Sequence, residues 1–170
     1  MPRSASLAAR IARRVRREGP LSIAAYMAIA LHDPGAGYYA TRDPFGAAGD
    51  FVTAPEISQI FGELIGACMI DFWQRIGRPE PVILAELGPG RFTLMADLLR
   101  ASRAVPEFRR ALRLTLVEAS PVLRREQQRR LTAVAPDVAL CFAEGIDALP
   151  DGPLLLVANE FLDALPIRQF

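Results

Sequence analysis

The stretch from Val82 to Arg91, VILAELGPGR, constrains the fold more than any other part of the chain. It is an apolar run that ends in Glu86 and then breaks into two glycines, Gly88 and Gly90, one residue apart. Such a run predicts a buried strand that leads into a tight loop, where backbone N–H groups are open to a nucleotide-like ligand. The sequence therefore predicts a cofactor-binding α/β domain.

Length and composition favour a single globular domain. The chain has 170 residues, about half of them apolar, which is enough for a substantial core. All twenty basic residues are arginine, a bias typical of a whole genome, so arginine richness alone does not indicate a nucleic-acid partner. The basic face predicted within residues 121–134 also lacks the interleaved aromatic side chains of nucleic-acid surfaces. We therefore expect no nucleic-acid partner.

Cysteine spacing argues against a metal-binding protein, and hydropathy argues against a membrane-spanning one. Cys68 and Cys141 lie far apart with no CxxC or Cys/His spacing, so we expect reduced core thiols and no metal site. No apolar run approaches the roughly eighteen residues that cross a bilayer, so we expect no membrane span. His32, the sole histidine, stands at a predicted helix end, where a capping or surface role is more common than catalysis.

The pattern of elements changes near Pro81. Before it, apolar spacing predicts helices over residues 4–17, 23–31 and 56–76, with a glycine-rich irregular segment over residues 35–55. After it, we expect strands over residues 82–87, 112–118, 138–142 and 154–159, and helices over residues 93–102 and 121–134. This alternation predicts an α/β fold with a doubly wound parallel sheet. We expect two parts: residues 1–80, with N-terminal helices and a lid-like loop, and residues 81–170, a Rossmann-like core.

The glycine loop fits some ligands better than others. Thr93 stands where a dinucleotide fingerprint needs its third glycine, and no Gly-Lys-Ser/Thr follows for a phosphate-binding P-loop. A second acid, Glu118, ends the next predicted strand. Ionised carboxylates accept hydrogen bonds from ribose hydroxyls and from an ammonium group, and S-adenosylmethionine (SAM) carries both. On these residues alone, a SAM site and a tight turn with two solvated acids are evenly balanced.

Six motifs resemble the MidA family in order and spacing. They are GPLSIAAYM at 19–27, DPGAGYY at 33–39, GDFVTAPEISQIFGE at 49–63, ELGPGR at 86–91, VEASP at 117–121 and NEFLDALP at 159–166. The resemblance covers nearly the whole chain from about Gly19 onward. That family includes the mitochondrial methyltransferase that acts as an assembly factor for respiratory complex I. The resemblance implies a Rossmann-like, class I SAM-dependent methyltransferase fold.

The resemblance also implies roles for particular residues around the cofactor. Glu86, Gly88 and Gly90 are expected to line the methionine end of SAM, and Glu118 to hold the ribose. Asp147, which follows the third predicted strand, is expected to flank the adenine.

On the substrate side, the resemblance implies a site after the fourth predicted strand. Asn159, Glu160 and Asp163 are the expected catalytic residues. Paired carboxylates suit a guanidinium, which stays protonated and is a poor nucleophile until its charge is localised away from the attacking nitrogen. Asp50 and Thr53 belong to a segment that we expect to close over the site as a lid.

Two features depart from the family pattern. Phe92 stands where the family usually has glycine. A bulky residue with positive φ there costs about 1–2 kcal/mol, and we expect its side chain to crowd the cofactor cleft. The chain also ends at Phe170, where a fifth strand is expected to begin. We therefore expect an incomplete sheet, whose open edge pairs with a missing C-terminal half or with a second copy in a dimer.

Three functions follow, in decreasing order of preference. The first is SAM-dependent methylation of a protein arginine, with a complex I subunit as the substrate that the resemblance suggests. The second is an inactive truncated remnant that acts as an assembly or interaction protein. The third, disfavoured by Thr93, is a nicotinamide-dependent oxidoreductase. We expect the protein in the cytoplasm of a bacterium or in the mitochondrial matrix of a eukaryote.

Overall fold

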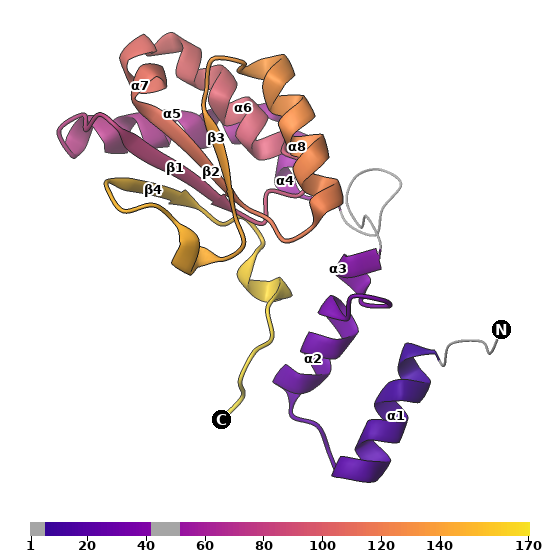
Figure 1. Ribbon diagram of the computed structural model, residues 1–170. Coiled ribbons are helices and arrows are strands. Elements are labelled where there is room, and N and C mark those ends of the chain that lie inside the picture. The colour runs from indigo at the N-terminus through magenta and orange to yellow at the C-terminus, as the bar shows by residue number, and fades with distance from the viewer. Residues whose placement is uncertain (1–5, 42–51) are drawn as a thin grey trace. The chain divides into compact units, whose positions relative to one another are not determined.

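The computed structural model describes residues 6–41 and 52–170 (Figure 1). The chain divides into two compact units, one formed by residues 1–44 with 160–170 and the other by residues 45–159. This division reflects contacts within the chain and not function, so the predicted functional division near residue 80 stays a prediction. Among the described residues, no helix has the length and apolar character that crossing a membrane requires.

The first unit is built on two short helices and the C-terminal segment. α1 (Leu7–Glu18) and α2 (Ile23–His32) confirm two of the predicted helices, and α3 (Tyr38–Thr41) follows. Serine caps the N-terminus of α1 and of α2, because Ser6 Oγ accepts from the N–H of Ala9 and Ser22 Oγ from that of Ala25. His32 Nε2 lies 2.9 Å from the carbonyl oxygen of Ala164, which ends the 3-10 turn η3 (Leu162–Ala164).

The second unit begins with two helices where we predicted one. α4 (Ala54–Ile57) and α5 (Gln59–Arg75) replace the continuous helix expected over residues 56–76. The prediction is wrong at Ser58, which is extended (φ −148°, ψ 124°) and whose Oγ accepts from the N–H of Ile60. A serine that caps a new helix in this way ends the previous one, although the apolar spacing runs through it.

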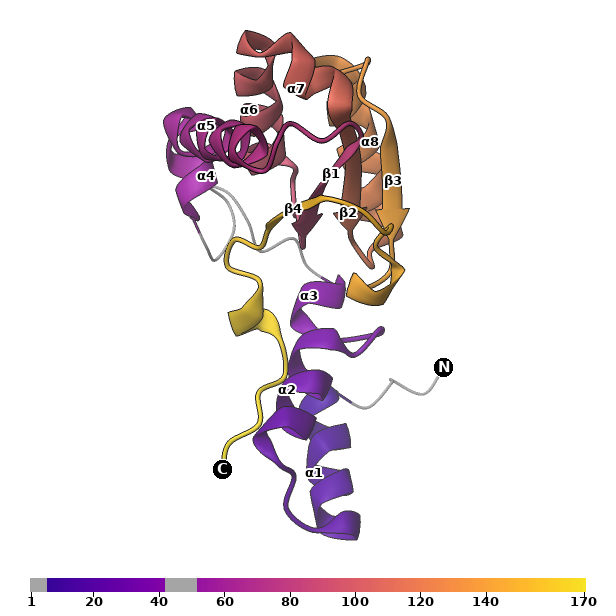
Figure 2. The same ribbon diagram turned by 90° about the vertical axis from the view of Figure 1, so that its left-hand side faces the viewer.

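A four-stranded parallel sheet forms the centre of the second unit and confirms the predicted α/β fold class. Its strands are β1 (Val82–Leu87), β2 (Leu112–Val117), β3 (Leu140–Ala143) and β4 (Leu154–Val157). They lie in the order β3-β2-β1-β4, which can be followed in both views of the ribbon (Figure 1 and Figure 2). β1 pairs with β2 along its whole length, from Val82 opposite Leu112 to Leu87 opposite Val117, and with β4 along four residues.

The connections between strands run partly as predicted. α6 (Thr93–Ala101) and α8 (Pro121–Val134) are the two helices expected between the first three strands. α7 (Pro106–Ala111), preceded by the 3-10 turn η1 (Ser102–Ala104), was not predicted, because six residues are too few for a clear helical period. A further 3-10 turn, η2 (Ile146–Ala148), lies between β3 and β4.

One face of the sheet carries the core. Alternate residues of the strands, such as Leu84 and Leu114, join apolar side chains from α5, α6, α7 and α8 in one buried cluster. The opposite face is less covered, since Leu154 and Leu156 of β4 remain 41% and 38% exposed. β4, although apolar along its length, is therefore buried on one face only. The two cysteines are also exposed, so they are not the core thiols that we expected.

α5 and α6 pack closely because two glycines on α5 face α6. A Cβ atom on Gly62 would lie 2.6 Å from Cβ of Asp97 and 3.1 Å from the carbonyl oxygen of Leu94. A Cβ atom on Gly66 would lie 2.9 Å from Cβ of Ala101. Any larger residue at these positions must push the helices apart, because part of what it meets is backbone.

Phe92 joins the loop after β1 to α6. Its backbone is left-handed (φ 69°, ψ 18°), a conformation that is strained for a bulky residue. Its side chain is completely buried in the core cluster. The ring therefore packs within the core, and the expectation that it crowds the cofactor cleft stays a prediction.

The close approach of the helices gives a stability prediction. Gly62→Ala should lower the free energy of unfolding by roughly 1–2 kcal/mol, because overpacking outweighs alanine's better helix propensity. Urea unfolding of the chain measures the difference. Gly145→Ala is the control, since a Cβ atom there meets nothing within 4 Å. Equal stability of the Gly62 and Gly145 variants would contradict the tight packing.

The buried phenylalanine gives a second prediction. Phe92→Gly relieves the left-handed strain but removes a large core side chain, so we expect a net loss of roughly 2–3 kcal/mol in the free energy of unfolding. Arg78→Gly is the matched control, because Arg78 is also left-handed (φ 55°) but exposed, and its replacement should change stability far less. A Phe92→Gly variant more stable than the parent would mean that backbone strain outweighs packing.

Candidate functional site

The strand order places a switch point between β1 and β4. From β1 the chain moves in one direction across the sheet to β2 and β3, and then returns to the other side of β1 as β4. In parallel sheets, ligands bind beyond the carboxyl ends of the strands at such a point, because the loops on its two sides diverge. The loop after β1, with Gly88 and Gly90, and Asn159 after β4 both lie at this edge.

The loop after β1 uses left-handed backbone at alternate positions. Gly88, Gly90 and Phe92 have φ values of 62°, 50° and 69°. The N–H of Gly88 donates to the carbonyl of Val117 (3.0 Å), which continues the β1–β2 ladder, and the N–H of Phe92 donates to the carbonyl of Pro89 (2.8 Å). Glycine is needed at the first two positions because only it adopts this conformation without strain. The chain therefore turns sharply from β1 into α6.

Glu86 is a buried acid at the end of the central strand. Its side chain is on the core side of β1 and the residue is only 3% exposed. Among the described residues, no hydrogen-bond partner reaches its Oε2 atom. Burial raises the pKa of the Glu86 carboxyl from 4.5 to about 8. A ligand with an ammonium group would supply the missing donor and the missing positive charge.

Glu118 is held firmly just beyond β2. Its Oε1 atom accepts from the N–H of Ser120 (2.8 Å), and its Oε2 atom accepts from Nε2 of Gln127 (3.2 Å). Nε of Arg124 donates to the backbone carbonyl of Glu118 (2.6 Å). All three partners belong to α8 or its N-cap, so this helix fixes both the backbone and the carboxylate of Glu118.

The remaining predicted cofactor and lid residues are less constrained. Asp147 lies in η2, beyond β3, and its side chain is exposed. Thr53 is the N-cap residue of α4 but makes no capping hydrogen bond through its side chain. Asp50 lies outside the described residues. The roles assigned to these three residues stay predictions.

The predicted catalytic residues are divided between the two units. Asn159 is half-buried and follows β4 in the sheet unit, whereas Glu160 and Asp163 are exposed and belong to the other unit. Glu160 has a left-handed backbone (φ 48°), which is uncommon for a residue other than glycine. Within its own unit, Asp163 is close enough to Tyr39 to help raise the pKa of that phenol, after the larger effect of burial. Their catalytic roles stay predictions.

Two side chains near the glycine loop, those of Glu56 and Gln127, were not predicted from the sequence. Oγ1 of Thr93 donates to Oε1 of Glu56 (2.5 Å), which links the start of α6 to α4. Gln127 donates to the carbonyl of Gly90 (2.8 Å) as well as to Glu118. The only sequence signal for Gln127 was that a polar residue interrupts the apolar stripe of its helix. The contact of Glu56 with Thr93 has no signal in the neighbouring sequence.

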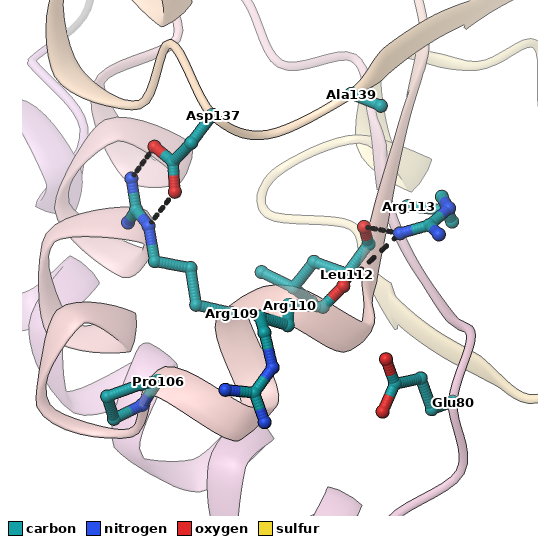
Figure 3. Close-up of a pocket in the computed structure, with 8 residues that line it drawn as sticks. All are labelled: Glu80, Pro106, Arg109, Arg110, Leu112, Arg113, Asp137 and Ala139. Atoms are coloured by element: carbon teal, nitrogen blue, oxygen red, sulfur yellow. Dashed lines mark hydrogen bonds and ion pairs between the residues drawn. The ribbon is translucent and has the colours of Figure 1, made fainter.

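A separate hollow of about 760 Å³ lies at the opposite end of the parallel strands (Figure 3). It is lined by Glu80, Pro106, Arg109, Arg110, Leu112, Arg113, Asp137 and Ala139. Arg109 donates two hydrogen bonds to the carboxylate of Asp137, both 2.6 Å long, so this pair supports the wall. Since Leu112 begins β2, the hollow is at the amino ends of the strands, away from the glycine loop. In the part of the chain that the structure describes, no three His, Cys, Asp or Glu side chains gather as a metal site.

The buried acid gives a pH-dependent prediction. Between pH 4.5 and about 8, folded Glu86 keeps its proton while the unfolded chain has lost it, so the free energy of unfolding falls as pH rises. Glu86→Gln cannot titrate. Its stability relative to the parent should therefore increase across this window, by on the order of a few kcal/mol.

Urea unfolding at pH 5, 6, 7 and 8 tests this prediction, with Glu107→Gln as the control because Glu107 is exposed. The control should follow the parent throughout. A difference between Glu86→Gln and the parent that stays constant with pH would show that Glu86 does not take up a proton on folding.

The family model and the curated relatives that we compared with this chain describe methyltransferases. A family model of S-adenosyl-L-methionine-dependent methyltransferases matches residues 64–170. The chain is 39% identical over 184 residues to the mitochondrial protein arginine methyltransferase NDUFAF7 homolog of Drosophila melanogaster, covering 96% of the chain and 41% of that protein. It is 35% identical over 177 residues to NDUFAF7 of Homo sapiens, covering 92% and 40%. The chain thus spans about two fifths of the length of these relatives.

Solved structures agree with the sequence relatives. A Burkholderia thailandensis protein bound to S-adenosyl-homocysteine superposes with a TM-score of 0.79 at 30% identity, covering 94% of this chain and 42% of that one. A native structure from the same organism has a TM-score of 0.74 at 31% identity, covering 95% and 40%. The family resemblance drawn from the six motifs is confirmed, and the chain belongs to the family of S-adenosyl-L-methionine-dependent methyltransferases.

Proposed function

We propose that this chain supplies the SAM-binding part of a protein arginine methyltransferase. The observation that carries the proposal is the buried Glu86, whose Oε2 atom lacks a partner among the described residues at the switch point of the sheet. A carboxylate without a cation is costly in such a place, whereas a carboxylate that receives a ligand's ammonium group is stable. The α-ammonium group of SAM fits this requirement.

The other cofactor contacts are proposed from position and chemistry. Gly88 and Gly90 would let the backbone approach the methionine end closely, because they carry no side chain. Glu118, on the neighbouring strand, would accept hydrogen bonds from the ribose hydroxyls. Asp147 would lie on the adenine side. Residues 81–170 would thus form a cofactor-binding core.

For the reaction itself, the protein mainly has to position the acceptor. When bound, SAM supplies a methyl group that its sulfonium already activates for in-line displacement. Asn159, Glu160 and Asp163 would hold the acceptor nitrogen in line and exclude water. The two carboxylates would bind the guanidinium of arginine and localise its charge away from the attacking nitrogen. Asp50 and Thr53 would belong to a lid over the site.

The acceptor is proposed from the relatives. Their names describe protein arginine methyltransferases of mitochondria, which supports a protein substrate. A complex I subunit as acceptor and the mitochondrial matrix as location are the finer parts of this proposal. A permanently charged guanidinium is bound by the carboxylates of Asp and Glu, and its binding requires no general base.

Calorimetric titration with SAM, S-adenosyl-homocysteine (SAH) and NADH tests the cofactor assignment. We expect binding of the first two and none of NADH. Glu118→Ala should weaken SAH binding at least tenfold, because a charged hydrogen-bond acceptor is lost. Glu107→Gln, an exposed change, should leave it unaltered. A folded chain that binds neither SAM nor SAH would contradict the proposal.

A further inference from the structure

Gln127 is a polar residue in an otherwise apolar stripe of α8. Leu123 and Leu131 lie one turn before and one turn after it, and Leu131 belongs to the buried core cluster. Gln127 itself is completely buried. A methionine of similar size would fill the position without the penalty of burying an amide. The amide is therefore explained by what it contacts and not by packing.

The contacts of Gln127 join the two segments that flank the cofactor site. Its Nε2 atom donates to the carbonyl of Gly90 (2.8 Å) and to Oε2 of Glu118 (3.2 Å). Both partners are acceptors, so the amide nitrogen and not the oxygen must face them. No hydrogen-bond partner for Oε1 of Gln127 occurs among the described residues. Burial of that oxygen without a partner costs free energy, which argues against a purely stabilising role for Gln127.

The hydrogen bonds that the Glu118 carboxylate accepts leave some of its acceptor positions open. A carboxylate has about four, two on each oxygen. Within the described part of the chain, the N–H of Ser120 uses one on Oε1, and Gln127 uses one on Oε2. One position remains on each oxygen, and the carboxylate cannot rotate without breaking both bonds. A pair of adjacent hydroxyl groups, as in ribose, matches this arrangement.

We propose that Gln127 is a positioning residue for recognition of a ribose diol: it locks the Glu118 carboxylate in orientation and fixes it relative to the glycine loop at Gly90. The proposal rests on the proposed function, because it assigns the diol to a SAM-type ligand. Gln127 acts through Glu118 and Gly90 and need not touch the ligand.

The first experiment compares SAH affinity across variants by calorimetry. Gln127→Met keeps the size of the side chain but removes the donor, and Gln127→Glu keeps size and polarity but places an acceptor against two acceptors. Each should weaken SAH binding about tenfold. Gln128→Met is the matched control, because it makes the same change on the next residue of α8, which is exposed, and should bind SAH as the parent does.

A double-variant cycle separates positioning from general loosening of the fold. In the Glu118→Ala background, Gln127→Met should weaken SAH binding by less than about threefold, because the contact with the Glu118 carboxylate is already absent and only the contact with Gly90 remains to be lost. An undiminished tenfold effect in that background would overturn the proposal. So would loss of SAH binding by both Gln127 variants together with loss of the cooperative unfolding transition, since Gln127 would then be a structural core residue.

The outcomes also separate this proposal from the function on which it rests. If the parent chain does not bind SAH, the proposed function fails and the Gln127 proposal fails with it. If the parent binds SAH and Gln127→Met binds it equally well, only the Gln127 proposal fails. Reduced discrimination between adenosine and 2′,3′-dideoxyadenosine in Gln127→Met would support the diol assignment directly.

Discussion

The pairing of β1 with strands on both of its edges is the constraint on which the sheet unit depends. β2 extends the sheet on one side and β4 on the other, so β1 is central and fully buried. The same pairing creates the switch point, because the chain leaves β1 on one side and returns on the other. A side chain at the carboxyl end of β1 is therefore both buried and next to the place where parallel sheets of this kind bind ligands.

Glu86 shows the consequence of that position. A carboxyl group in a core is unfavourable, and burial raises its pKa to about 8. The fold accepts this unfavourable group on its most buried strand. Such a violation of the usual rule for core residues is expected where a ligand provides the missing partner. Under the proposed function, stability of the free chain and affinity for a cationic ligand would be opposed at the Glu86 carboxyl group.

The elements that the sequence predicted well have clear local boundaries. β1 was predicted with its observed ends, because Pro81 and Gly88 enclose a continuous apolar run, and α8 was predicted because Pro121 marks its start. The break at Ser58 was missed, since apolar spacing continues through it, and α7 was too short to show a period. Exposure of the cysteines was also missed, because it depends on what covers each face of the fold.

For the candidate site, the sequence by itself determined the glycine loop and the two acids at neighbouring strand ends, because these depend on short motifs and on strand order. Tertiary structure alone decided that the Phe92 ring lies in the core, that Glu86 lacks a partner on Oε2 among the described residues, and that Gln127 bonds to Gly90, 37 residues earlier. Local patterns specify backbone conformation and residue type. The direction and partners of a side chain depend on packing between distant segments, which no local pattern contains.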